Sequence, residues 1–183
     1  MGVILNPITE TRDWVERVVI GLNLCPFAPA PALKGLIRYA TSDAETQEAL
    51  LADLSTELQR LVASPPEELE TTLLIHPRVL QGFRDFNDFL AVADELLRVS
   101  ELEGVIQIAS FHPHYQFADA DSDDIGNATN RSPYPTLHLL REESISRAVD
   151  AFGDTRRISA ANLATLARLG PAGLQAVRCG KPA

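Results

Sequence analysis

Apolar residues recur along this chain at two different spacings. Apolar positions three or four residues apart are typical of helices that bury one face, and short β-branched or apolar runs are typical of strands. The helical spacing predicts helices over about 11–24, from about Asp43 to Pro65, over about 85–98, from Pro135 through Phe152, and over about 159–169. The apolar runs predict strands over 36–40, 71–75 and 105–111.

This order of elements predicts a small α/β domain. Strands separated by helices of ten or more residues are usually parallel and are joined by right-handed crossovers. We therefore expect three layers, with a mostly parallel sheet of at least three strands and about five helices. We expect the 183 residues to form a single domain with a core over about 11–170 and a weakly patterned tail over 171–183.

Composition and charge exclude several classes of protein. With 16 Lys and Arg against 25 Asp and Glu, the net charge of −9 argues against a nucleic-acid partner. Two cysteines are too few for a disulfide-rich secreted scaffold, and no signal peptide or membrane-spanning run is present in the sequence, so we expect a cytoplasmic protein with no membrane contact. The ten glycines form no nucleotide-binding motif, and no nucleotide cofactor is implied.

Two His-Pro pairs, His76-Pro77 and His112-Pro113, each follow a predicted strand. In an open parallel sheet the carboxyl ends of the strands share one edge, where ligands bind. We therefore expect the two imidazoles to project from the same edge. The alternative is that each histidine ends its strand and binds backbone carbonyls with its ring.

The segment from Asn130 to Tyr134 lies just before the predicted start of the fourth helix. Unpaired amides and the positive end of the helix dipole favour an anion there, and Arg131 would add a forked donor for a carboxylate or phosphate. The alternative is a turn and helix cap beside a solvated arginine. Tyr115 and Gln116, in the loop after the third strand, could border the same crevice.

His138 lies near the start of the same predicted helix, and the helix dipole would keep its imidazole neutral. Glu142, four residues later, would share its helical face and orient the ring. The alternative for Glu142 is an ion pair with Arg141 or Arg147.

A divalent metal is the most specific hypothesis for these residues. His76, His112 and His138 would supply nitrogen ligands, and Glu142, Cys25 or water would complete the coordination shell. The sequence contains no HExxH or CxxC motif, so the ligands would have to converge from separate elements. Cys25 otherwise fits a small buried hydrophobic position rather than a nucleophile, because it follows the end of a helix.

Several phrases of the sequence resemble the family known as domain of unknown function 1415. They are the stretches 14–27, Glu70–Pro77, Ser110–Pro113 with 115–117, and Asn130–Pro135 with Leu137–Glu142, and the similarity covers about residues 11–170. The resemblance implies a single domain. It also implies that a shared polar pattern includes His76, His112, Asn130, Arg131, Tyr134, His138, Arg141 and Glu142.

Together these features predict an enzyme that acts on a small anionic metabolite by metal-assisted hydrolysis or related acid/base chemistry. The hypothesis requires the rings of His76, His112 and His138 to meet in one hollow. The alternatives are a binding or regulatory module for a small anion, and an interaction protein in which these residues only organise loops. The catalytic candidates are His76, His112, His138 and Glu142, and the substrate-binding candidates are Tyr115, Gln116, Asn130, Arg131, Ser132 and Tyr134.

Overall fold

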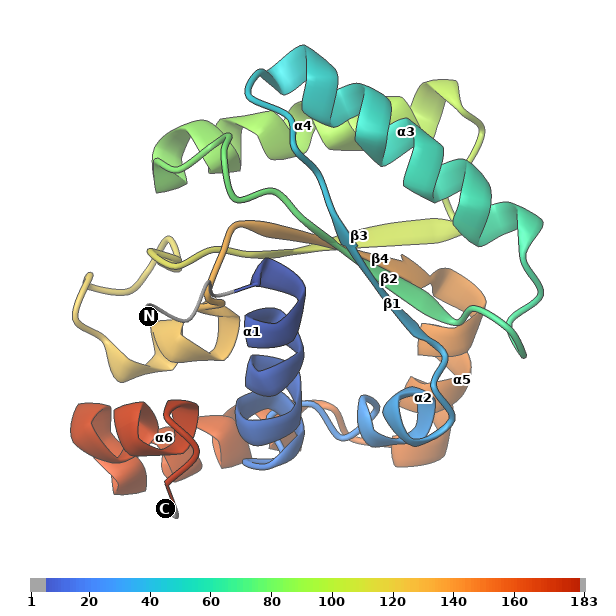
Figure 1. Ribbon diagram of the computed structural model, residues 1–183. Helices are drawn as coiled ribbons and strands as arrows, with labels where there is room; N and C mark the ends of the chain where they lie inside the picture. The colour runs from blue at the N-terminus through green and yellow to red at the C-terminus, as the bar shows by residue number, and fades with distance from the viewer. Residues whose placement is uncertain (1–5, 182–183) are drawn as a thin grey trace.

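A four-stranded sheet crosses the middle of the molecule, and helices cover both of its faces (Figure 1). The computed structural model describes residues 6–181. The strands are β1 (Ile37–Thr41), β2 (Thr71–Ile75), β3 (Ile106–Phe111) and β4 (Thr136–Arg141), in the order β1-β2-β4-β3. The upper face in Figure 1 carries α3 (Gln47–Ala63) and α4 (Phe83–Val99).

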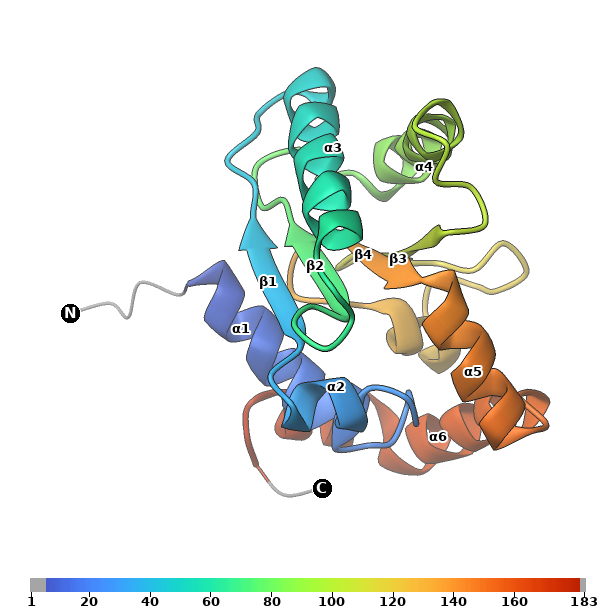
Figure 2. The ribbon, with the colours of Figure 1, turned by 90° about the vertical axis from the view of Figure 1, so that its right-hand side faces the viewer.

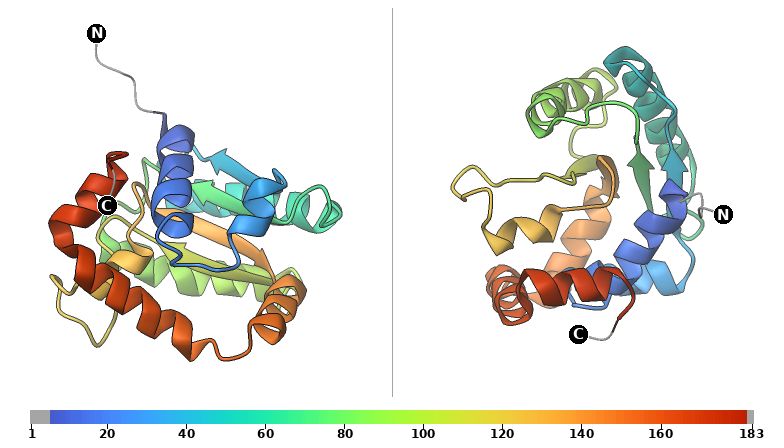
Figure 3. Two further views of the ribbon diagram at one scale, coloured as in Figure 1. Left: turned by 90° about the horizontal axis from the view of Figure 1, so that it is seen from below. Right: turned by 60° about the vertical axis from the view of Figure 1, so that its left-hand side comes forward.

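The lower face of the sheet carries the remaining helices. They are α1 (Pro7–Trp14), the π-helix η1 (Val15–Ile20), α2 (Pro29–Leu33), α5 (Glu142–Phe152), α6 (Arg156–Arg178) and the short 3₁₀ helix η2 (Ile125–Asn130). In the view from below, α1 lies in front of the strands, and α6 and α5 lie along the border of the sheet (Figure 3). Among residues 6–181, no helix combines the length and the apolar character needed to cross a bilayer.

The α/β class is confirmed, but the prediction of a mostly parallel sheet is wrong. Only β1 and β2 pair in parallel, and β4 lies antiparallel between β2 and β3. The three strands expected from the sequence still run in the same direction, because β2 and β3 are both antiparallel to β4. Their carboxyl ends therefore do share one edge.

The fourth predicted helix begins too early, because residues 136–141, directly after its predicted first residue, form β4. Leu137 and Leu140 fit a helical spacing with Ile145, which favoured a helix. However, Leu137 and Leu139 also alternate with polar residues, and both are fully buried against α3 and α4. The segment forms a strand rather than a helix because β3 pairs with it in the sheet.

Other predicted boundaries shift for local reasons. The helix expected near Asp43 begins at Gln47, where Thr46 caps it by accepting from the Ala49 amide at 3.2 Å. The tail expected to be weakly patterned is helical, because α6 breaks at Gly170 (φ 63°) and then continues to Arg178.

Two hydrophobic cores lie on opposite faces of the sheet. Because successive strand residues point to opposite faces, Leu74 joins the core beneath α3 and α4 whereas Leu73 joins the other core. The upper core also contains Leu50, Leu54, Leu58, Phe86, Phe89, Leu137 and Leu139, and the lower core contains Trp14, Val18, Leu24, Leu166, Leu174 and Val177.

The first predicted helix, over about 11–24, is divided between α1 and the π-helix η1. In η1 the wider backbone repeat is visible in the bond from the Gly21 amide to the Glu16 carbonyl, at 3.0 Å. A π-helix is rare and often occurs at functional sites. A Cβ at Gly21 would overlap the carbonyl oxygen of Arg17, so the end of η1 requires glycine.

We predict that Gly21→Ala lowers the free energy of unfolding by about 2 kcal/mol, because the added methyl group forces the η1 backbone to shift. Urea denaturation measures the change. Gly82→Ala is the matched control, since a Cβ there would have 3.4 Å to its nearest neighbour, Asp85, and we expect a change under about 1 kcal/mol. Equal effects in the two variants would contradict this explanation.

Candidate functional site

A cavity of about 580 Å³ lies between the sheet and the helices of its lower face. This volume is in the range of small-molecule sites, which are mostly apolar with a few polar groups. The apolar lining includes Trp14, Val19, Phe27, Pro31, Ile37, Leu73, Ala109, Phe111, Leu140 and Ile145. Among the polar members are Cys25, Lys34, Thr71, Gln107, His138 and Ser144.

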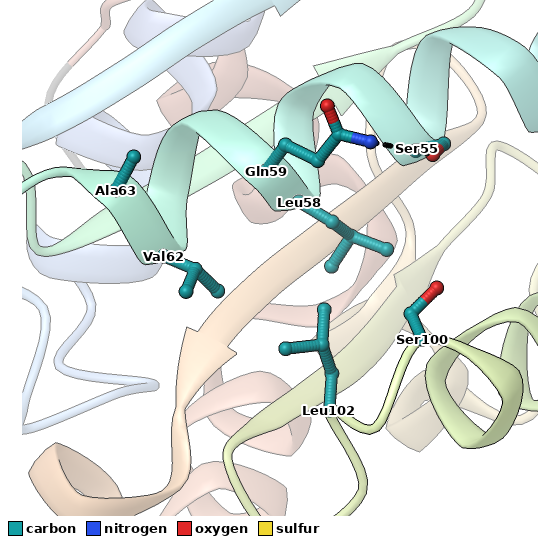
Figure 4. Close-up of a pocket in the computed structure, with 7 residues that line it drawn as sticks. All are labelled: Ser55, Leu58, Gln59, Val62, Ala63, Ser100 and Leu102. Carbon is teal, nitrogen blue, oxygen red and sulfur yellow. Dashed lines mark hydrogen bonds between the residues drawn. The ribbon is translucent and has the colours of Figure 1, made fainter.

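A second hollow, of about 340 Å³, lies on the opposite side of the sheet beside α3 (Figure 4). Leu58, Val62 and Leu102 form much of its surface, and the Gln59 amide donates to Ser55 Oγ at 3.5 Å. Among residues 6–181, those that line this hollow carry no titratable group. It offers no acid or base for catalysis, so the first cavity is the candidate site.

His138 lies on the cavity wall formed by the sheet. It belongs to β4, where its neighbours across the ladders are Leu73 and Ala109, two other cavity residues. Thr71 Oγ1 donates to the Leu139 carbonyl at 2.6 Å and lies 2.8 Å from His138 Nε2. Because the threonine proton is already donated, Thr71 accepts the bond and His138 Nε2 carries the proton.

The remaining nitrogen of His138, Nδ1, is therefore an unprotonated acceptor. In the described part of the chain it has no hydrogen-bond partner. Burial lowers the pKa of His138 to about 4, so the ring is neutral at pH 7. A helix dipole was expected to keep this imidazole neutral. The helix begins only at Glu142, however, and burial is what keeps the ring neutral.

Cys25 also lines this cavity, as a half-buried free thiol. The sequence suggested a small buried hydrophobic position, because Cys25 follows the predicted first helix. The chain instead turns after Leu24 and runs along the cavity toward α2. Thr71 and Gln107 were not predicted as site residues. Alternation of side chains along β2 and β3 would have shown which face of the sheet each one occupies only after β4 had been recognised as a strand.

His76 and His112 lie on the other face of the sheet, at the shared edge. Both are fully buried, and their rings flank Phe86 at centroid distances of 5.7 Å and 5.1 Å. His76 Nδ1 donates to the Val79 carbonyl at 3.0 Å, and His112 Nε2 donates to the Leu80 carbonyl at 3.2 Å. These bonds hold the loop after β2, as the strand-ending alternative describes.

Burial also keeps these two histidines neutral. It lowers the pKa of His76 to about 4, and it is the main cause of the lowered pKa of His112. The second nitrogen of His112 accepts from the His114 amide at 3.0 Å. His112 therefore has both nitrogens engaged with backbone, whereas His76 Nε2 is buried without a partner in the described chain.

The sheet separates His138 from His76 and His112, so the common hollow expected for the three rings is not formed. His76 continues the face of Leu74, and His138 shares the opposite face with its ladder neighbour Leu73. Within residues 6–181, no group of three or more His, Cys, Asp and Glu side chains is arranged to hold a metal ion. The three histidines therefore do not form the metal site expected from the sequence.

The expected anion site before Pro135 also lacks its helix, because β4 follows. Arg131 donates to the Tyr115 and Ser122 carbonyls at 3.0 Å and 2.7 Å. Three further candidates bind backbone in the same region: Asn130 donates to Ser110, Ser132 to Tyr134 and Gln116 to Ala120. These side chains join the loops around η2.

Tyr134 and Glu142 lie apart from His138 as well. Burial and the nearby Glu10 carboxylate raise the pKa of Tyr134 to about 12. Glu142 is the first residue of α5, and its amide donates to the Val105 carbonyl at 3.0 Å. It does not orient the imidazole, whose Nε2 is held by Thr71.

The guanidinium of Arg141 points toward α3, where it donates to the Leu61 and Ser64 carbonyls, each at 2.7 Å. These are carbonyls of the last turn and cap of α3, which a cation stabilises. Arg147 pairs instead with Glu143, at 3.7 Å. The ion pair considered between Glu142 and either arginine is therefore not formed.

The chain belongs to the family described as protein of unknown function (DUF1415), whose model matches residues 6–176. This confirms the resemblance found in the sequence. Comparison with curated proteins and with solved structures finds no match.

We predict that stability falls between pH 7 and pH 5, because the unfolded chain protonates His76 and His138 near pH 6.5 whereas the folded chain does so only near pH 4. The stabilisation is complete above pH 6.5 and is lost as the pH falls toward 4. At pH 5 each histidine accounts for a loss of about 2 kcal/mol. Urea denaturation at pH 7 and pH 5 measures this loss of stability. His138→Gln should remove about half of the loss. An unchanged pH dependence in this variant would contradict the assignment of the effect to His138.

We also predict that Thr71→Val changes the tautomer of His138, because Nε2 loses the acceptor that holds its proton. The ¹⁵N chemical shifts of the labelled imidazole measure the change. Thr71→Ser keeps the hydroxyl group and should restore the spectrum of the unaltered protein. A single Nε2-protonated form in Thr71→Val would show that Thr71 does not set the tautomer.

Proposed function

We propose that this protein is an enzyme that binds a small, mainly apolar organic molecule in the cavity and uses His138 as a general base. The observation that carries the proposal is the bonding of the His138 ring. Thr71 holds the proton on Nε2, which leaves the neutral Nδ1 of a cavity residue able to accept a proton.

Acid/base chemistry requires a group that changes its protonation state within reach of the ligand. Of the three histidines considered, only His138 meets this condition, because His76 and His112 are fully buried and bind loop carbonyls. Low polarity around the ring favours the neutral base. When His138 takes a proton, the resulting imidazolium keeps its bond to Thr71 through Nε2.

The apolar walls favour a ligand with an aliphatic or aromatic body. Phe27, Leu73 and Phe111 supply extensive apolar contact area. Lys34 is exposed at the cavity and, within residues 6–181, has no carboxylate within the 4.0 Å of an ion pair. An acidic group on the ligand would find its partner there, which agrees with the anionic metabolite expected from the sequence.

We predict that the cavity binds the neutral apolar dye N-phenyl-1-naphthylamine, with increased fluorescence. Ala109→Trp should weaken this binding at least about tenfold, because the indole fills the space beside His138. Ala63→Trp is the matched control, since Ala63 lines the second hollow and its replacement should leave the binding unchanged. Equal binding by all three proteins would show that the dye does not occupy the cavity.

Turnover is tested with a panel of small esters, amides and carbon acids at pH 7.5. We expect His138→Gln to lower the rate of any substrate accepted by the protein at least about 100-fold, while dye binding persists. Retention of full activity would eliminate His138 as the base. Dye binding with no turnover of any substrate would favour the non-catalytic binding module.

A further inference from the structure

We infer that residues 25–34, which include α2, form a lid that opens and closes the cavity. The role of this lid rests on the proposed function, because the lid covers the proposed ligand site. Its opening can nevertheless be measured without a ligand. Figure 2 shows α2 and α5 on the same side of the sheet, and residues of both helices line the cavity.

The lid segment forms a wall of the cavity but has little core of its own. Cys25, Phe27, Ala30 and Pro31 line the cavity, yet α2 has only five residues, none of them buried, and no side-chain cap. Leu33 is 88% exposed. Elements with few buried contacts open at low free-energy cost, so this wall can move without disrupting the core.

The lid is bounded by two residues with left-handed backbone conformations. Asn23 has φ 53° and Gly35 has φ 69°. One residue after each of these positions the chain is fixed to the rest of the fold. Leu24 is buried and its carbonyl accepts from Asn162 Nδ2 at 2.8 Å, and the Leu36 carbonyl accepts from the Glu70 amide at 3.0 Å. Only the segment between these anchors is free to swing.

One aromatic contact joins the lid to the opposite wall. The rings of Phe27 and Phe152 meet edge to face with centroids 5.7 Å apart. Phe27 lines the cavity, whereas Phe152 ends α5 and is 45% exposed. Because Phe152 does not line the cavity, its removal weakens closure without changing the surface that a ligand would contact.

The thiol of Cys25 reports on opening, since Cys25 is the first residue of the lid, lines the cavity and is only half-exposed, so that opening uncovers it. The other cysteine, Cys179, is exposed and is removed by Cys179→Ser. In this background the rate of reaction of Cys25 with 5,5′-dithiobis(2-nitrobenzoate) measures access. We expect Phe152→Ala to raise the rate about 2- to 10-fold, in line with the strength of one aromatic pair.

Phe117→Ala is the matched control, because Phe117 is 41% exposed and packs against Tyr115 in a different loop. It should leave the rate unchanged. Hydrogen exchange provides the second measurement: in Phe152→Ala, faster exchange should be confined to the amides of residues 25–34 and the end of α5. Three results would overturn the lid. They are an unchanged rate of thiol reaction in Phe152→Ala, an equal rise of that rate in Phe117→Ala, and faster hydrogen exchange spread through α6.

The outcome separates the lid from the proposed function. A raised thiol rate together with no dye binding would support the lid and contradict the ligand site. Dye binding that depends on Ala109, together with an unchanged thiol rate, would support the ligand site and overturn the lid.

Discussion

The position of β4 between β2 and β3 is the constraint on which the site depends. Because β3 pairs with β4, this strand connects β3 to the rest of the sheet. Its alternation then assigns Leu137 and Leu139 to the upper core and His138 to the lower face. A shift of one residue in the register would exchange these faces, so the buried leucines hold the imidazole at the cavity.

Many polar residues of this chain serve the loops rather than the cavity. Asn127 is fully buried, accepts from the Phe117 amide at 3.0 Å and donates to the Asp121 carbonyl at 2.8 Å. Arg131 and the His-Pro histidines make similar bonds to backbone carbonyls. Long loops that pass beneath the surface need partners for their amides and carbonyls, which explains polar clustering without catalysis.

The sequence predicted the parts of the fold that depend on local patterning. The strand over 71–75 follows from a run of apolar residues, and the helices α3 and α4 follow from apolar residues at helical spacing. The shared edge of His76 and His112 follows from strand direction. The segment 136–141 could not be assigned in the same way, because its leucines satisfy both the helix and the strand period. Long-range pairing with β2 and β3 decides between them.

The site was predictable only in part for the same reason. His138 was identified as a neutral base, but its partner was expected to be Glu142, four residues away on a helix. In a strand the ring instead meets Thr71, 67 residues earlier in the chain. The assumption that three histidines share one hollow failed because the sequence pattern did not show which side of the sheet each would face.

The separation of the two cores has a consequence for evolution. Dense packing of leucine and phenylalanine beneath α3 and α4 sustains the fold, whereas the opposite half surrounds an open volume. Exchanges among the half-buried and exposed residues that border this volume cost little folding energy compared with exchanges in the packed half. Members of the family can therefore diverge in the chemistry they accommodate while inheriting the same scaffold.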